Sequence, residues 1–246
     1  MMPLSPLFAQ PIEQVLVETY HVQEGSAEGP QLMTYRIYLD LAPEHSLQVI
    51  YGDEKHTLRI ETTPAFFNTE NGSVVYGDRL IVDPKNFDAL AMDSWLTIGM
   101  VGSDHVGVPR ELDMDGSILE CPTPLASGAR AQGAILEPLC IADGLAAAPE
   151  AREVVTWRLD QGYLGTAKGT VILSNDAAWG MLGGMKGATE ENVVLVAQIT
   201  TSGPLHFVLN AQVGLPDGGY VRVVPSDPQE GELLFEQLTY GQRPAY

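Results

Sequence analysis

YRIYLDLAPEHSLQVIYG, residues 35–52, alternates apolar and polar side chains, turns at a proline and ends on a glycine. The same order returns in VLVAQITTSGPLHFVLNAQVG, residues 194–214. Successive side chains of a strand point to opposite faces, so alternation with a period of two predicts strands with one apolar and one polar face. We interpret each stretch as a hairpin, and the repetition as two paired hairpins of one fold.

The alternation in residues 35–41 assigns Ile37 and Leu39 to a core face, and Arg36, Tyr38 and Asp40 to a solvent face. Similar patterns predict strands at residues 15–22, 58–61, 74–82, 94–100, 154–159, 169–173, 193–200, 205–213 and 220–224. Helical signals are few, and 17 prolines with 25 glycines interrupt the chain too often for long helices. The sequence therefore predicts an all-β fold, a two-sheet antiparallel β-sandwich of the jelly-roll kind.

The predicted domain organisation follows from the positions at which the alternating pattern begins and ends. Residues 1–14 are interpreted either as a disordered N-terminus or as the remnant of a signal peptide, because MMPLSPLFAQ has a short apolar run before a small residue. Residues 15–246 are expected to form a single β-sandwich domain. Within it, residues of about 103–153 are rich in Ala, Pro and Gly, which predicts a long irregular loop.

The net charge of −19 arises from 32 acidic against 13 basic residues. Such a surface repels nucleic acid at long range, so we expect no nucleic-acid partner. The chain has no apolar run of about 18 residues, so it predicts no membrane span.

Two cysteines, Cys121 and Cys140, bracket the segment CPTPLASGARAQGAILEPLC. In an exported protein a disulfide between them would close this loop and stabilise the fold by about 3 kcal/mol. Two reduced, half-buried thiols are the alternative, and the sequence does not choose between them.

Three stretches suggest a family: residues 35–72, residues 92–99 (MDSWLTIG) and residues 179–219 (beginning WGMLGGMKG). Together they resemble an extracellular β-sandwich module found in secreted and surface proteins of Bacteroidetes-type bacteria. The resemblance implies a secreted or cell-surface location, no assigned catalytic residues, no cofactor, and surface glycans or other extracellular proteins as partners. We therefore expect a non-catalytic structural or adhesive module. The alternatives are a carbohydrate-binding module and a jelly-roll hydrolase.

Glu111, Asp113 and Asp115 precede Gly116 at alternate positions, as in the first part of a calcium loop, and Glu120 would be a late ligand. The pattern departs from such a loop because it starts with Glu, has Pro122 at position twelve and follows no helix. The sequence allows a Ca²⁺ site, or an ordinary acidic turn whose carboxylates accept nearby backbone N–H groups.

Other candidate sites are weaker. Ser103, Asp104 and His105 are adjacent in sequence, and neighbouring residues of an extended chain point apart, so we expect no catalytic triad. WGMLGGMKG, residues 179–187, lacks the hydroxyl residue of a phosphate loop and is interpreted as an irregular turn. Aromatic side chains form either a sugar-binding platform or part of the core; the candidates are Trp95, Trp157, Trp179, Phe66 and Phe67.

Overall fold

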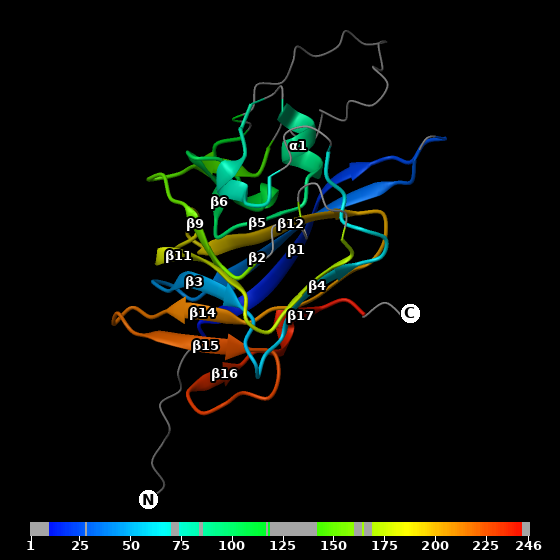
Figure 1. Cartoon of the computed structure of the whole chain (residues 1–246). Coiled ribbons are helices and arrows are strands. Elements are labelled where there is room, and N and C mark those ends of the chain that lie inside the picture. Colours follow the sequence, from blue (N-terminus) through cyan, green and yellow to red (C-terminus); the bar gives the residue numbers. More distant parts are fainter. Residues whose placement is uncertain are drawn as a thin grey trace, which may run out of the picture.

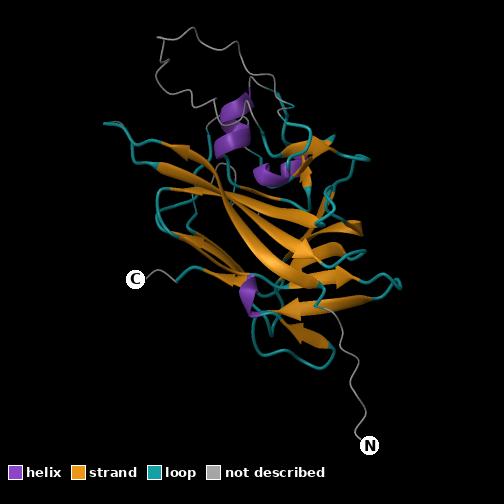
Figure 2. Cartoon of the chain, turned by 180° about the vertical axis from the view of Figure 1, so that it is seen from behind, coloured by secondary structure: helices purple, strands orange, loops and turns teal. Residues whose placement is uncertain are grey.

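The protein is almost entirely built from strands (Figures 1 and 2). The computed structural model describes residues 10–27, 29–69, 74–83, 86–116, 118, 142–159, 164 and 169–242. Its short helical segments are α1 (Phe87–Met92) and the 3₁₀ turns η1 (Gly77–Arg79), η3 (Arg110–Leu112) and η5 (Glu236–Leu238). In this part of the chain no helix has the length and apolar character needed to cross a bilayer.

Across the described residues the strands form four sheets. The β2–β12 sheet contains, in spatial order, β1 (Ile12–Gln23), β2 (Leu32–Leu41), β12 (Val193–Thr201) and β5 (Trp95–Leu96). The β4–β13 sheet contains β10 (Val171–Ser174), β4 (Leu58–Thr62), β13 (Leu205–Val208) and β17 (Thr239–Tyr240). The six-stranded sheet contains β16 (Glu232–Leu234), β15 (Tyr220–Val224), β14 (Ala211–Gly214), β3 (Ser46–Tyr51), β11 (Ala178–Met185) and β9 (Val154–Trp157). The small sheet contains β6 (Met100–Val101), β7 (His105–Gly107) and β8 (Leu145–Ala147).

This arrangement confirms the all-β class but shows that the predicted two-sheet, jelly-roll-like sandwich is wrong. Four small sheets stand around the core in a propeller-like ring instead of two sheets stacked face to face. The strand pairs are antiparallel except for β15 with β16, which run parallel. In Figure 1 the six-stranded sheet is seen as a stack from β9 down to β16, with the β2–β12 sheet crossing behind it.

The two repeated stretches are corners rather than hairpins, which is why the sandwich prediction failed. β2 leads through the turn at Pro43 into β3 of another sheet, and β12 leads through Gly203 into β13 of a third sheet. A side chain at Gly203 would overlap the backbone of Thr63, so this corner requires glycine. The stretches instead pair with each other, because β2 pairs with β12 and β3 pairs with β14. The two similar stretches are therefore partners in the same sheets, and not two separate hairpins.

The main core is one cluster of apolar side chains that come mostly from the three larger sheets, with Met100 and Val106 from the small sheet. β12 lies at its centre, and all nine of its residues are buried. Trp179 is completely buried beside it, and its indole Nε1 donates a hydrogen bond to the carbonyl of Thr97 at 3.0 Å. A strand buried on both faces carries few of the polar positions that an exposed sheet face requires.

The predicted solvent face of β2 is also buried, which corrects the assignment of Arg36 and Tyr38. Both side chains are completely inaccessible to solvent. A second apolar cluster covers them; besides Tyr38 it contains Leu80, Leu90, Trp95, Val101, Leu145, Val193 and Leu195. These residues come from the end of η1, from α1, β5, β12 and the small sheet, and α1, β5, β6 and β12 are labelled in the upper half of Figure 1. The two faces of β2 are therefore both buried: its apolar face packs in the main core, and its polar face packs in this second, partly polar core.

Arg36 makes this second core polar. Its guanidinium lies 3.4 Å from the centre of the Tyr20 ring. Its Nε donates to Oε1 of Gln198 at 2.9 Å, and its Nη1 donates to the carbonyl of Gly144 at 3.0 Å. A buried charge is tolerated only when such contacts replace its water. The hydrogen bond to Gly144 thus links the chain just after residues 119–141 to β2, in the middle of the β2–β12 sheet.

Several predicted boundaries change in the structure. β1 begins at the buried Ile12, while residues 1–9 lie outside the described part of the chain. The predicted loop of residues 103–153 contains β7, η3 and β8, and its residues 119–141 also lie outside the described part. The predicted strand at 74–82 contains the 3₁₀ turn η1.

The glycine-rich stretch 179–187 is mostly strand β11 rather than an irregular turn. Its pairing with β3 shifts register between Gly180 and Met185, which marks a bulge. Gly183 and Gly184 have φ of +79° and +73° in this bulge, a backbone conformation that favours glycine.

Candidate functional site

An open groove lies between η1, the β6–β7 turn and the residues that lead into β9. Its volume is about 490 Å³, and its lining residues are Asp78, Arg79, Ser103, Ala151, Arg152 and Glu153. Three segments far apart in sequence thus contribute two guanidinium groups, two carboxylates and a hydroxyl. Such a mixture offers both donors and acceptors to a polar ligand.

The two arginines of the groove are held differently. Arg152 donates from Nε to Oε1 of Glu150 at 2.9 Å and from Nη1 to the carbonyl of Gly184 at 2.6 Å, and its Nη2 also bonds Glu150. The guanidinium of Arg79 lies 5.2 Å from the centre of the Tyr76 ring and forms no ion pair within the described residues. Arg152 is therefore fixed by its neighbours, whereas the donors of Arg79 are free for a ligand.

The carboxylate of Asp78 lines the groove and is hydrogen-bonded to the start of β9. Its Oδ2 accepts a hydrogen bond from the backbone N–H of Val154 at 3.2 Å, at the start of β9. Its Oδ1 is enclosed and has no hydrogen-bond partner among the described residues. Burial raises the pKa of Asp78 above its usual value, and the neighbouring charge of Glu153 acts in the same direction. Asp78 thus ties η1 to β9.

β9 continues from the groove as the outermost strand of the six-stranded sheet. It pairs with β11 on one side, and no other described strand pairs with its free edge. Val155 and Trp157 lie two residues apart and therefore face the same side; their exposed fractions are 42% and 66%. Leu182 of β11 is 79% exposed. We call these three residues the β9 rim.

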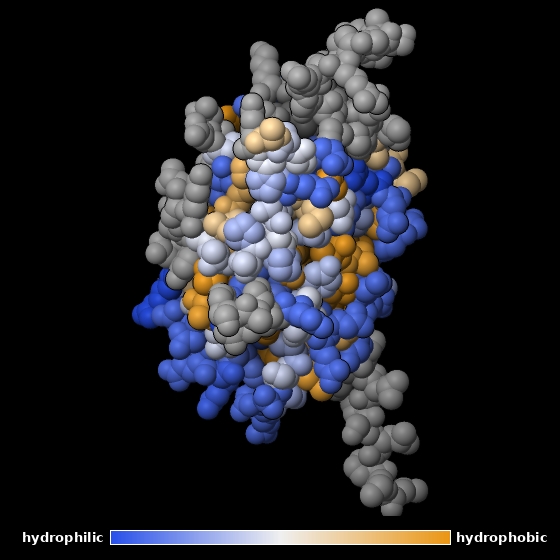
Figure 3. All heavy atoms as spheres, turned by 90° about the vertical axis from the view of Figure 1, so that its right-hand side faces the viewer, coloured by the Kyte–Doolittle hydropathy of each residue, from blue (hydrophilic) through white to orange (hydrophobic). Residues whose placement is uncertain are grey.

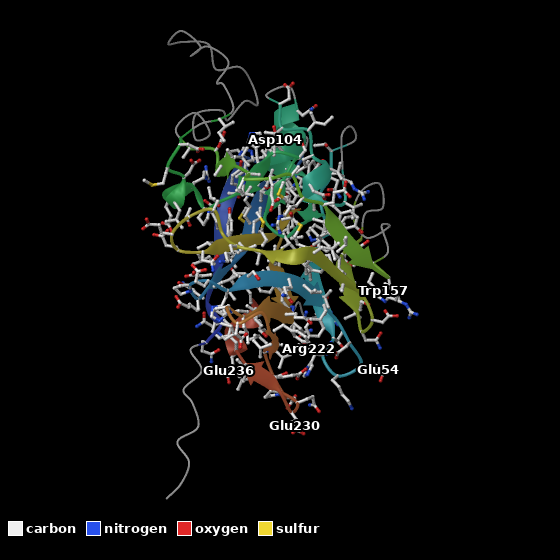
Figure 4. The ribbon with its side chains drawn as sticks, turned by 90° about the vertical axis from the view of Figure 1, so that its left-hand side faces the viewer. Glu54, Asp104, Trp157, Arg222, Glu230 and Glu236 are labelled. Atoms are coloured by element: carbon white, nitrogen blue, oxygen red, sulfur yellow. The ribbon has the colours of Figure 1, made fainter. Side chains whose placement is uncertain are left out.

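Trp157 is the most prominent member of the β9 rim. It lies at the end of β9, at the margin of the view in Figure 4, with Arg222 of β15 nearer the middle. The guanidinium of Arg158 lies 6.0 Å from the Trp157 ring and bonds Oδ2 of Asp176 at 3.0 Å. A large aromatic ring left in water retains apolar area that a ligand is able to cover.

The opposite side of the molecule, shown in Figure 3, has apolar areas separated by hydrophilic ones, with hydrophilic residues prevailing in its lower part. Trp157 is the only exposed indole among the described residues. The groove and the β9 rim, which adjoin in sequence, are therefore taken as the candidate site.

The predicted sugar platform is mostly core. Trp95 and Trp179 are completely buried, Phe66 is 1% exposed, and Phe67 is half-buried. Only Trp157 of the five predicted residues is exposed in this structure. Its neighbours in the site, especially Arg79 and Arg152, were missed because no motif connects them in sequence.

The predicted calcium stretch is a turn that uses Asp113 as a structural acceptor. Oδ1 of Asp113 accepts the N–H of Gly116 at 3.0 Å, and Oδ2 accepts the N–H of Gly144 at 2.9 Å. Burial and then the adjacent Asp115 raise the pKa of Asp113. Glu111 lies in η3, and Glu120 lies outside the described residues. Among the residues that are described, no cluster of three His, Cys, Asp or Glu has the geometry of a metal site.

Other predicted groups are placed as follows. Nδ1 of His105 lies 2.9 Å from Oδ1 of Asp104, so these two neighbouring side chains approach each other. Ser103 instead lines the groove. Cys121 and Cys140 both lie outside the described residues, so their predicted disulfide stays a prediction.

Comparisons of this chain with protein-family models, with curated proteins and with solved structures found no match.

Proposed function

We propose that this chain is a non-catalytic adhesive module that binds a glycan across the β9 rim and the adjoining groove. The exposed indole of Trp157 is the observation that carries the proposal. Aromatic rings bind the apolar faces of sugar rings by stacking, while nearby polar groups bind the hydroxyls. Here the groove begins at residues 151–153, immediately before β9, so one short segment supplies both kinds of contact.

A secreted or cell-surface location is part of this proposal. It is supported by the resemblance of residues 35–72, 92–99 and 179–219 to an extracellular module. Detection of the chain in the medium or on intact cells of its source would support this location. Exclusive recovery inside the cells would contradict it.

Binding is measured with a panel of soluble polysaccharides, using the exposed tryptophan as a reporter. The chain has three tryptophans, and Trp95 and Trp179 are completely buried, so a neutral quencher such as acrylamide acts mainly on Trp157. A bound glycan should protect this fluorescence from quenching. Trp157→Ala should abolish binding without changing the melting temperature, because the side chain is mostly in water.

Tyr220→Ala is the matched control variant, because Tyr220 is a similarly exposed aromatic residue (62%) on β15 of the same sheet. It should bind as the wild type does. Equal binding by the wild type and Trp157→Ala would overturn the proposal, as would the failure of every glycan in the panel.

One observation favours a second candidate, a glycoside hydrolase acting in the same groove. Hydrolysis of a glycosidic bond uses two carboxyl groups, one of them with a raised pKa, and Asp78 and Glu153 line the groove together. Against it, Oδ1 of Asp78 is enclosed and Oδ2 already accepts the Val154 N–H. Release of reducing ends by the wild type, lost in Glu153→Gln, would favour the hydrolase.

A further inference from the structure

We infer that the glycan bound at this site carries a carboxylate, and that Arg79 is the residue that recognises it. The inference rests on the proposed function and names the chemical class of its ligand: a short oligosaccharide with a uronic-acid-type sugar. Arg79 is exposed, lines the groove, and lies in η1 directly after Asp78.

The first argument is that Arg79 donates no side-chain hydrogen bond, although the protein is strongly acidic. Seven arginines lie in the described residues, and six of them donate side-chain hydrogen bonds: Arg36, Arg59, Arg110, Arg152, Arg158 and Arg222. Arg79 alone among these seven donates no side-chain hydrogen bond; its guanidinium contacts the Tyr76 ring and is attracted through space by the carboxylate of Asp78. With 32 acidic residues in the chain, an exposed arginine that faces a groove without a hydrogen-bonded carboxylate leaves its N–H donors for a ligand.

The second argument is that Arg79 is oriented. Its guanidinium lies 5.2 Å from the centre of the ring of Tyr76, a residue that is 1% exposed. Stacking on a buried ring limits the positions of a long side chain, so less entropy is lost when it binds. A planar guanidinium held in this way matches a carboxylate, which accepts two parallel hydrogen bonds.

The third argument concerns the other groups of the groove, which disfavour a simple anion. The carboxylate of Glu153 and the partly buried Asp78 repel an inorganic anion, and Arg152 already bonds Glu150 and Gly184. A sugar acid has hydroxyls beside its carboxylate, and these donate to Glu153 and exchange hydrogen bonds with Ser103. Trp157 lies four residues beyond Glu153 along an extended strand, about 13 Å away, so the apolar face that covers it belongs to a neighbouring sugar of the same oligosaccharide. The net charge of −19 opposes long, densely charged polymers, so the ligand carries isolated acidic sugars.

The test compares a glucuronic-acid-containing oligosaccharide with the otherwise identical glucose oligosaccharide, measured by calorimetry and by acrylamide protection of Trp157. The wild type should bind the acidic ligand about tenfold to a hundredfold more tightly, the range expected for a hydrogen bond between charged groups. Arg79→Ala should remove this preference, so that the variant binds the acidic and the neutral ligand with similar affinity. Arg79→Lys should keep part of the preference, because it keeps the charge but not the planar donors.

Arg158→Ala is the control for loss of any positive charge near the site, since Arg158 contacts the Trp157 ring but bonds Asp176. It should keep the preference. If the wild type binds both ligands equally, or Arg79→Ala keeps the preference, this inference fails while the proposed glycan module stands. If neither ligand protects Trp157 and no other glycan binds, both proposals fail.

Discussion

Replacing Gln198 with leucine should severely destabilise the fold. Gln198 lies on β12 and is completely buried. Its Oε1 accepts from Nε of Arg36, and its Nε2 donates to the carbonyls of Leu90 and Asp93, each at 2.9 Å. One side chain thus connects the central sheet to α1 and to the buried arginine.

The magnitude follows from what the substitution leaves behind. Leucine has nearly the same size but no polar atoms, so one charged donor and two carbonyls lose their partners in a region without solvent. Each unsatisfied buried group costs about 1–3 kcal/mol. Partial relaxation brings the expected total to about 4 kcal/mol, a large part of the 5–15 kcal/mol typical of a folded protein. For a chain of this size the melting temperature should fall by roughly 8–16 °C.

Urea unfolding followed by circular dichroism measures the loss, with Gln212→Leu as the matched control. Gln212 is half-buried on β14 and donates one hydrogen bond, to Oε1 of Gln48. Water is able to replace that bond, so the control should lose about 1 kcal/mol or less. Similar losses in the two variants would refute the reasoning that the second core depends on Gln198.

Three further predictions concern the groove, the acidic turn and the cysteines. Burial raises the pKa of Asp78 above the usual value of an aspartate, so the folded chain binds this proton more tightly than the unfolded chain does. The wild type should therefore gain stability relative to Asp78→Asn as the pH falls from about 7 to 4; parallel urea midpoints would contradict this. Asp113→Ala should lower the melting temperature equally in calcium and in chelator, because Gly116 and Gly144 lose an acceptor, whereas Asp115→Ala should not. A loss seen only in calcium would instead identify a calcium loop. Cys121 and Cys140 should be joined in protein purified under oxidising conditions, and mass spectrometry finding two free thiols would exclude the link.

The alternation of apolar and polar residues predicted most of the strands, because side chains of a strand alternate between its two faces in any sheet. β15 was predicted with its observed bounds, and β2, β12 and β4 were located to within a few residues. The same pattern does not say which strands pair. Pro43 and Gly203 indicate turns in sequence, but a turn within a hairpin and a corner between sheets use the same residues. The predicted sandwich was wrong for that reason.

The candidate site was predictable only in part. Trp157 was one of five aromatic candidates, and its sequence context does not distinguish it from the buried Trp95 and Trp179. The exposure of Trp157 depends on the position of β9 as the outermost strand, and that position is a property of the whole sheet. Arg36 shows the opposite error, because a charged residue at a polar position of the pattern is buried by elements that come from elsewhere in the chain.

The pairing of β2 with β12 has a consequence for synthesis on the ribosome. β1 and β2 emerge early and are able to form a two-stranded ribbon, but such a ribbon is marginal alone. Its partner strand, Val193–Thr201, is translated only after most of the chain has been made. Until then the apolar side chains of β2 have no core to enter, and they are available to other nascent chains. Completion of this fold is therefore expected to be a late event, and the nascent chain should depend on chaperones that shield exposed strands.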